Sequence, residues 1–326
     1  MPKISVIMPA YNAEKYIAQA IESILGQTFG DFELIVLNDC SKDKTGEIIA
    51  SFADQRIVCV NNEENMGVAR TLNKGLKIAR GEYIARMDAD DISLPERLEK
   101  QAAFLDTNEA AAVVGSAVER FDETGSLGKR VFAADPRQMD IEMLFACGLA
   151  HPSVMMRRTL VTGLGGYDAD YEGLEDYELW WRVSRSHQVT ALPEVLLRYR
   201  IHSAQVTKNP SEKYIKRHRA LKQRQLEALG LPAQGELAES YYRFCLGDRP
   251  KDVGGVKVLC ALLESMLAAN RRMGRYDETG LKAYFSAIAV NAATQLGLSD
   301  GWKLCRGCKL VGLLPLIKGK LRRLVK

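Results

Sequence analysis

The sequence predicts an α/β protein with helices on both faces of a largely parallel sheet, followed by a mostly helical C-terminal region. Short apolar runs rich in β-branched residues alternate with helical stretches over the first ninety residues, and the alternation fades after about residue 207. Uninterrupted apolar runs of this length are typical of parallel strands that are buried on both faces. The 326 residues, 47% of them hydrophobic and 26% charged, are enough for a large core and exclude a disordered or fibrous chain.

The first strand is expected over residues 3–8, because the run KISVIM is apolar and ends at Pro9, which has no amide hydrogen for a sheet ladder. A helical stretch and a second apolar run, ELIVL, follow at the spacing of a β-α-β unit. The same pattern then repeats. It predicts helices over 14–25, 45–52 and 68–79, and strands over 33–37, 57–60 and 83–87.

Beyond residue 91 the periodicity predicts a less regular succession of elements. The apolar run AAVVGSAVERF ends at a glycine-containing turn over 123–125, and turns at 231–232 and 247–250 separate the last helices. The expected elements are a helix over 95–106, strands over 111–121, 153–156 and 189–191, and helices over 177–186, 214–229 and 256–269.

Three carboxylates directly follow the strand expected over 83–87, in the segment Asp88-Ala89-Asp90-Asp91. Ligands of an open parallel sheet bind at the carboxyl ends of its strands, so this loop lies where a ligand is expected. Like charges this close repel unless a cation lies between them, and hard oxygen ligands suit Mg²⁺ or Mn²⁺. The alternative is an acidic turn in which Asp91 caps the helix expected to begin at Pro95.

The loops after the other strands add residues that suit a nucleotide. Tyr11 can lie flat against a base or ribose, and Asp39 can accept a hydrogen bond from a base N–H. Arg70, in the first turn of the helix that follows Gly67, is a candidate contact for a phosphate or a base edge. Taken singly, Asp39 is also explained by an Asx turn and Arg70 by a solvated helix surface. Together these loops outline a nucleotide.

Four segments in this order resemble the nucleotide-binding half of a family 2 glycosyltransferase with the GT-A fold, whose sheet is Rossmann-like. They are VIMPAYN (6–12), NDCSKD (38–43), NMGVAR (65–70) and MDADD (87–91). The chain departs from the family pattern at Asn38, where the family often has Asp, and at Cys40, where it often has Gly.

The resemblance implies roles for the residues in these segments. Asp90 would be the metal ligand, Asp88 would contact the ribose or the sugar, and Asp39 would contact the base of a nucleotide-diphosphate sugar. The cofactor would be a divalent metal, Mn²⁺ or Mg²⁺. The remaining nucleotide-sugar contacts that it implies are Pro9, Tyr11, Asn12 and Arg70.

The resemblance continues to about residue 207 on the acceptor side. The segments HPSVMMR (151–157), GGYD (165–168) and EDYELW (175–180) carry it. Glu175 and Asp176 begin a helix, where the dipole favours negative charge and where Asp176 is suited to cap as well as to act as a base. The resemblance implies that Asp176 is the general base, which needs hydrogen-bond reach of an acceptor hydroxyl, and that Glu175 is a supporting acceptor contact.

The segment YRIHSAQVT (199–207) resembles the part of the family that closes over the diphosphate. His202 follows a strand and stands near Arg200, so it is expected to reach the metal or the pyrophosphate. A purely structural histidine is the alternative.

Charge is distributed unevenly along the chain. Residues 1–207 hold 22 Lys and Arg against 31 Asp and Glu, whereas residues 208–326 hold 23 against 10. Residues 302–326 contain eight Lys and Arg, no acid and many interleaved apolar residues. This tail is expected to lie on an anionic membrane surface, and a helix docked on the core or a nucleic-acid tail are the alternatives. The acidic first half and the lack of a base-reading motif argue against nucleic acid.

The cysteines and the N-terminus predict a cytoplasmic protein. The seven cysteines are scattered, the Cys305-x-x-Cys308 pair lacks the partners of a zinc or redox site, and residues 1–4 do not begin a signal peptide. No run of about 18 apolar residues is present, so no membrane span is expected.

We therefore predict a transferase domain over 1–207, with nucleotide-sugar binding over 1–91 and the acceptor side over 92–207, and a helical basic region over 208–326. The predicted reaction is inverting, metal-assisted sugar transfer to a hydroxyl of a lipid-linked or cell-surface glycan precursor in polysaccharide biosynthesis. A nucleotidyltransferase or a catalytically inactive nucleotide-binding scaffold is the alternative. A dinucleotide dehydrogenase is excluded, because the first strand is followed by PAYN instead of Gly-x-Gly-x-x-Gly.

Overall fold

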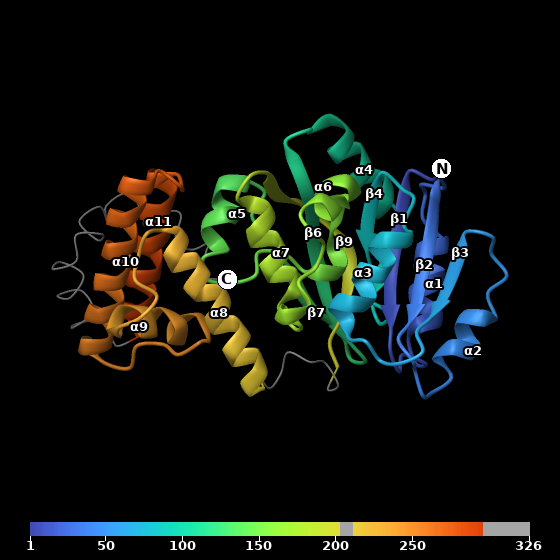
Figure 1. Ribbon diagram of the computed structural model, residues 1–326, viewed down its shortest axis with the longest axis horizontal. Coiled ribbons are helices and arrows are strands. Elements are labelled where there is room, and N and C mark those ends of the chain that lie inside the picture. The colour runs from blue at the N-terminus through green and yellow to red at the C-terminus, as the bar shows by residue number, and fades with distance from the viewer. Residues whose placement is uncertain (203–210, 296–326) are drawn as a thin grey trace. The chain divides into compact units, whose positions relative to one another are not determined.

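A computed structural model describes residues 1–202 and 211–295 (Figure 1). The chain divides into two compact units. The first comprises Met1–Met143 and Cys147–Tyr214, and the second comprises Leu144–Ala146 and the chain from Ile215 onward.

The first unit is built on one nine-stranded sheet with the order β3-β2-β1-β4-β8-β6-β9-β5, and β7 pairs with β6 beside this path. Strands β1 to β4 are mutually parallel, β8 is antiparallel to both of its neighbours, and β6 and β9 are parallel. The strands are β1 (Ile4–Ala10), β2 (Phe32–Asn38), β3 (Ile57–Asn61), β4 (Tyr83–Arg86), β5 (Ile92–Ser93), β6 (Ala111–Asp122), β7 (Gly125–Arg130), β8 (Met155–Arg157) and β9 (Gln188–Arg200).

Helices flank this sheet on both faces, as the sequence predicts (Figure 1). They are α1 (Ile17–Leu25), α2 (Thr45–Ala50), α3 (Val68–Ile78), α4 (Arg97–Thr107), α5 (Pro136–Glu142), α6 (Arg158–Gly163) and α7 (Glu175–Ser184), with short 3₁₀ turns at His151–Ser153 and Ala169–Tyr171. The predicted arrangement of a sheet with helices on both faces, followed by a helical C-terminal region, is confirmed.

The core of the first unit lies around β1 and β2, whose residues are almost all buried. This explains their continuous apolar sequences, because a strand covered on both faces has no solvent side to fill with polar residues. Helix α3 packs closely on β1 at Gly75, where a Cβ atom would come within 2.6 Å of the Ile7 side chain.

The acceptor-side elements differ most from the sequence prediction. Strand β9 was expected only over 189–191, yet it continues to Arg200 because a register shift opposite Ala117 accommodates Pro193. A bulge of this kind is one of the few places where a sheet tolerates proline. The strand expected over 153–156 begins instead as a 3₁₀ turn and becomes β8 only at Met155.

The second unit is helical, as predicted. It contains most of α8 (Glu212–Ala228) together with α9 (Glu236–Cys245), α10 (Val253–Met273) and α11 (Glu278–Gln295). The Phe145 ring is central to its core and lies 5.8 Å from the rings of both Tyr241 and Phe285. Lys222 is fully buried and donates to the Leu144 carbonyl at 2.6 Å.

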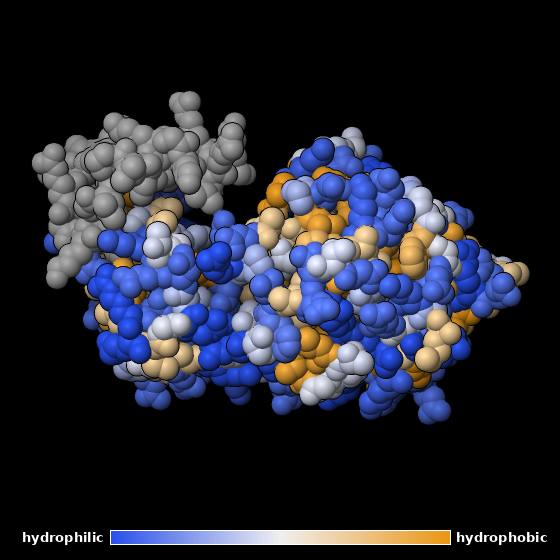
Figure 2. Space-filling view, turned by 90° about the horizontal axis from the view of Figure 1, so that it is seen from above, coloured by the Kyte–Doolittle hydropathy of each residue, from blue (hydrophilic) through white to orange (hydrophobic). Residues whose placement is uncertain are grey.

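Helix α10 is long and apolar enough to cross a bilayer by length and composition, contrary to the sequence expectation that no segment is. Several of its apolar residues are buried in the second unit, and a core helix passes the same test. The described surface in Figure 2 is mostly hydrophilic, with apolar residues in small patches. The basic tail over 302–326 lies outside the described residues.

Candidate active site

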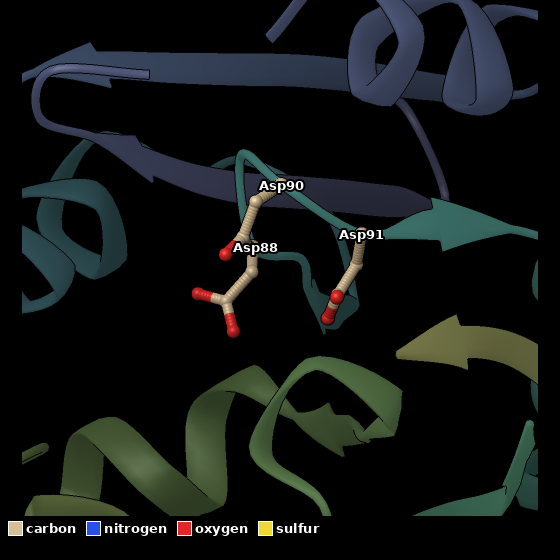
Figure 3. A group of neighbouring side chains, drawn as sticks. All are labelled: Asp88, Asp90 and Asp91. Atoms are coloured by element: carbon tan, nitrogen blue, oxygen red, sulfur yellow. The ribbon is translucent and has the colours of Figure 1, made fainter. Parts of the chain in front are cut away.

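Three aspartates gather at the carboxyl end of β4. Asp88, Asp90 and Asp91 each bring a carboxylate oxygen within 4.8 Å of the other two, and Asp91 is fully buried. Figure 3 shows that their carboxylates point to the same side of one short loop. This arrangement of hard oxygen ligands can hold a divalent metal ion.

The carboxylate of Asp91 does not cap the following helix, so that alternative is wrong. Its Oδ1 accepts a hydrogen bond from the backbone N–H of Arg200 at 2.8 Å, and α4 begins only at Arg97. Its Oδ2 is buried and has no hydrogen-bond partner among the described residues. Burial and the charges of Asp88 and Asp90 raise the pKa of Asp91 well above its ordinary value.

Arg86 is a buried cation, only 4% exposed, at the end of β4. It forms an ion pair with Asp88. Burial alone would lower the pKa of Arg86, but the charge of Asp88 holds it above its ordinary value. Burial raises the pKa of Asp88, although Arg86 opposes this shift. Arg86 also favours the ionised form of Asp176, so its charge acts on both halves of the predicted site.

His202 lies beside the aspartate cluster, as its predicted role requires. Its Nε2 atom is 2.8 Å from Asp90 Oδ2, and its ring lies 5.6 Å from the ring of Tyr16. Arg200 donates from Nε to the Asp90 carbonyl at 2.7 Å. The segment that ends β9 is therefore joined to the aspartate loop by two side chains. Whether His202 binds metal stays a prediction.

Asp39 lies buried at the end of β2, where its carboxylate is fixed by three donors. Oδ1 accepts from the Asn62 side chain at 2.7 Å and from the Met66 N–H at 2.9 Å, and Oδ2 accepts from the Gly67 N–H at 3.0 Å. Met66 and Gly67 lie in the third motif and Asn62 lies just before it, so an Asx turn at Asp39 is not the explanation. The local hydrogen bond in this loop is made by Asn38 instead, whose Oδ1 accepts from the Ser41 N–H three residues on.

The loop after β1 is joined to the loop after β2 through Asn12. Its side-chain oxygen accepts from the Lys42 N–H at 2.9 Å, and its own N–H donates to Ser41 Oγ at 3.0 Å. Pro9 is partly buried beside these contacts, and Tyr11 is 50% exposed, which leaves its ring accessible to a ligand. Cys40 has a φ of +60°, which explains why glycine suits this position.

The first two backbone amides of α3 are not free to bind an anion. The N–H groups of Val68 and Ala69 donate to the carboxylate of Glu172 at 2.6 and 3.1 Å. Arg70 is exposed one residue further on and makes no side-chain hydrogen bond or ion pair among the described residues. Its contact with a phosphate or base stays a prediction, but the first two amides of the helix are already occupied.

Asp176 stands in the first turn of α7 and does not cap it. Its Oδ1 accepts from the N–H of Tyr177 at 2.7 Å, and its Oδ2 accepts from the thiol of Cys147 at 3.6 Å. Burial raises the pKa of Asp176 above its ordinary value. Burial together with the charge of Asp176 raises the pKa of Glu175 to about 7.

Glu175 is nearly fully buried next to His151. Its Oε2 accepts from the Gly173 N–H at 2.5 Å, and its Oε1 lies 3.9 Å from His151 Nδ1. Burial and the nearby charge of Arg86 hold the pKa of His151 well below its ordinary value, so this histidine is neutral at pH 7. Its Nε2 bonds the Tyr167 hydroxyl at 2.9 Å.

Three residues of this arrangement were missed by sequence reasoning. Arg86 carried a signal, because a charged residue at the end of a buried strand needs a partner. Cys147 and Glu172 carried none, since their partners lie 29 and 103 to 104 residues away in the chain.

Comparison with known proteins places this geometry in a family. The profile described as "Glycosyl transferase family 2" matches residues 5–163. An uncharacterized glycosyltransferase of Methanocaldococcus jannaschii is 38% identical over 207 residues, which cover 61% of this chain and 71% of the relative. The chain belongs to glycosyl transferase family 2. It is therefore a glycosyltransferase, and the resemblance inferred from the four motifs is confirmed.

Two further relatives of this transferase are bacterial. The putative glycosyltransferase EpsE of Bacillus subtilis is 40% identical over 186 residues, which cover 56% of this chain and 66% of EpsE. The UDP-Glc:alpha-D-GlcNAc-diphosphoundecaprenol beta-1,3-glucosyltransferase WfgD of Escherichia coli is 32% identical over 241 residues, which cover 73% of this chain and 90% of WfgD.

Solved structures share the fold. TarS 1–349 of S. aureus, in complex with UDP-GlcNAc, has a TM-score of 0.57 at 17% identity and covers 94% of this chain and 92% of that chain. The mannosyltransferase PcManGT of Pyrobaculum calidifontis, in complex with GDP-Man and Mn²⁺, has a TM-score of 0.54 at 18% identity and covers 93% and 85%.

Proposed function

We propose that this transferase moves a sugar from a nucleotide-diphosphate sugar to an acceptor hydroxyl with inversion at the anomeric carbon, and that Asp176 is the general base. One observation carries the proposal. Glu172, four residues before Asp176, accepts from the N–H groups of Val68 and Ala69 at 2.6 and 3.1 Å, and these amides adjoin the turn that Asp39 holds. The segments expected to bind donor and acceptor are thus bonded to each other within one unit.

The donor is proposed to bind along the ends of β1, β2 and β4. Asp39 Oδ1 has two protein donors, but Oδ2 has one and retains a lone pair for a base N–H. Tyr11 offers an exposed ring for stacking, while Pro9 and Asn12 shape the loop that carries it. The solved relatives in complex with UDP-GlcNAc and with GDP-Man support a nucleotide-diphosphate sugar as the donor class.

The aspartate cluster fits a divalent metal, Mn²⁺ or Mg²⁺. Its oxygens converge within 4.8 Å, the buried Oδ2 of Asp91 has no hydrogen-bond partner among the described residues, and no thiolate competes in the cluster. Asp90 and His202 would hold the ion, and Asp88 would contact the ribose or the sugar. When bound, such a cation offsets negative charge on the leaving diphosphate.

The reaction proposed is a single displacement. The bond from the acceptor oxygen to the anomeric carbon forms as the bond from that carbon to the diphosphate oxygen breaks. Asp176 Oδ2 takes the proton of the acceptor hydroxyl, so the carboxylate must be ionised at the start. Glu175 is proposed to hold the acceptor, and its pKa of about 7 allows it to donate or accept a hydrogen bond.

The acceptor is proposed to be a lipid-linked glycan precursor, because the relative WfgD acts on GlcNAc-diphosphoundecaprenol. The transferase region is proposed to span 1–207, and the basic region 208–326 to attach it to the cytoplasmic face of the membrane through residues 302–326. Flotation with vesicles of anionic phospholipid tests the tail. Removal of residues 302–326 should abolish flotation, and unchanged flotation would refute this part of the proposal.

The Asp176→Asn variant tests the function. Thermal shifts with UDP-, GDP- and dTDP-sugars, each with Mn²⁺, first identify the donor, and CMP-sugars, which carry a single phosphate, serve as the comparison. A ligand at 100 times its Kd stabilises by about 2.7 kcal/mol. Release of nucleoside diphosphate in the presence of GlcNAc-diphosphoundecaprenol then measures transfer. The variant should keep the thermal shift and lose transfer about 10²–10⁴-fold. Equal transfer by both proteins would refute the base assignment, and donor binding without transfer by the wild type would favour the inactive scaffold.

A further inference from the structure

Glu172 and Asp39 together bind four successive backbone amides. Asp39 accepts from the N–H groups of Met66 and Gly67, and Glu172 accepts from those of Val68 and Ala69. Asp39 comes from the end of β2, whereas Glu172 comes from the loop that leads into α7. One short turn is therefore held by a carboxylate from the donor side and a carboxylate from the acceptor side.

The bond between Glu172 and α3 is well suited to hold two segments together. Helix α3 has no side-chain cap of its own, and the carboxylate satisfies two of its free amides where the helix dipole favours negative charge. Gly67 permits the approach. Its φ is +82°, and a Cβ atom there would lie 2.8 Å from Glu172 Oε1.

The loop that carries Glu172 continues directly to the proposed base. The next residue, Gly173, donates its N–H to Glu175 Oε2 at 2.5 Å, and Asp176 follows in the first turn of α7. Hydrogen bonds, linked by short stretches of backbone, thus connect Asp39, which is expected to contact the nucleobase of the donor, to Glu175, the residue before the proposed base Asp176.

We propose that Glu172 is a positioning residue that couples occupation of the nucleotide site to the placement of Asp176. This inference rests on the proposed function, because it assumes that Asp39 contacts the nucleobase of the donor and that Asp176 is the general base. A nucleobase N–H that binds Asp39 Oδ2 contacts the same oxygen that accepts the hydrogen bond from the Gly67 N–H. Through Val68, Ala69 and Glu172, the same turn sets the position of the segment Gly173–Asp176. Coupling of this kind is reciprocal between the two ligands.

The experiment compares the wild type with Glu172→Ala, with Glu172→Gln, which keeps one carbonyl oxygen, and with Asp135→Ala. Asp135 is the matched control, because its carboxylate also accepts a helix N-terminal amide, from Arg137 at 2.9 Å, on α5. Amide hydrogen exchange of residues 173–177 is measured without nucleotide and with UDP or GDP, each at saturation with Mn²⁺. Thermal shifts in the same solutions report nucleotide binding.

In the wild type and in Asp135→Ala, the bound nucleotide should slow exchange of residues 173–177 at least threefold. In Glu172→Ala the nucleotide should still bind within threefold of the wild-type Kd, but it should no longer slow amide exchange of residues 173–177. The kcat of this variant should fall at least tenfold, with little change in the KM of the donor. Glu172→Gln should recover part of both effects. A purely stabilising role would lower the melting temperature and leave the exchange response intact.

The outcomes separate the two proposals. Nucleotide binding with unchanged exchange of residues 173–177 in the wild type, or an exchange response that survives in Glu172→Ala, overturns the coupling and leaves the proposed function standing. Failure of UDP, GDP and every sugar nucleotide of the thermal-shift panel to bind the wild type overturns the proposed donor site and the coupling with it.

Discussion

The thiol of Cys147 donates a hydrogen bond to Oδ2 of Asp176 across 3.6 Å. The thiol remains protonated at neutral pH, because burial and the charge of Asp176 raise the pKa of Cys147 well above its ordinary value. A donor that faces a carboxylate favours the ionised form, so the thiol opposes the upward shift that burial imposes on the pKa of Asp176. Cys147 therefore helps to keep the proposed base ready to accept a proton.

Replacement of Cys147 by Ala should move the acid limb of the pH profile of kcat/KM to higher pH. Loss of the thiol donor raises the pKa of Asp176 further, and the carboxylate then ionises only at higher pH. Cys147→Ser keeps a hydroxyl donor and should shift the limb less. The measurement is donor turnover from pH 4 to pH 9, and identical acid limbs in all three proteins would show that the thiol does not act on the base.

Replacement of Gly67 by Ala should destabilise the first unit by more than backbone strain alone. The residue has a φ of +82°, and its new Cβ would also meet the carboxylate of Glu172. Gly128 is the matched control, since its φ is +96° and nothing lies within 4 Å of a Cβ there. Backbone strain at a position with positive φ costs about 1–3 kcal/mol. Gly128→Ala should therefore lower the free energy of unfolding by this amount, and Gly67→Ala should lower it more.

The double variant Gly67→Ala/Glu172→Ala isolates the contact. Gly67→Ala should lower the free energy of unfolding less in the Glu172→Ala background than in the wild type, because the carboxylate that the new Cβ would contact is absent. Urea unfolding of the wild type, Gly67→Ala, Glu172→Ala, the double variant and Gly128→Ala measures the free energies. If Gly67→Ala and Gly128→Ala lower the free energy of unfolding equally, the Glu172 side chain moves aside without cost and the prediction is wrong.

Most of the donor side could be predicted from the sequence because its signals are local. The strands β1, β2 and β4 are largely apolar runs, and Tyr11, Asp39 and Asp88 each follow one of them within two residues, so sheet topology alone brings these loops to one edge. The pairing of Asp90 with His202 also agrees with the sequence expectation, although 112 residues separate them, because the resemblance covered both segments.

The acceptor side could not be predicted as well because its determinants are distant contacts. Glu172 has no neighbour in sequence that marks it as a helix cap, and Cys147 lies in a stretch with no periodicity. The strand expected over 189–191 continues to Arg200, because the register shift between β6 and β9 accommodates Pro193. The two carboxylates of α7 were found, but not that burial would raise the pKa values of both.

Glu33 provides a test of stability against pH at a site far from catalysis. Its buried side chain accepts from the Ser5 hydroxyl, from the Arg80 N–H and from the Arg80 guanidinium, all within 2.9 Å. Burial raises its pKa, but the bonds from Arg80 and Ser5 outweigh burial and hold the pKa of Glu33 below its ordinary value of 4.5.

A carboxyl group with a lowered pKa in the folded state contributes stability above its unfolded pKa and loses it as pH falls through the folded pKa. The Glu33→Gln variant should therefore be less stable than the wild type by about 1.5–3 kcal/mol at pH 7, the value of hydrogen bonds to a charged group. The difference should shrink as pH falls below 4.5, because the wild type becomes protonated while the variant does not titrate. Urea unfolding at pH 7, 5 and 3.5 measures it, and a difference that stays constant across this range would show that the ionised carboxylate contributes nothing.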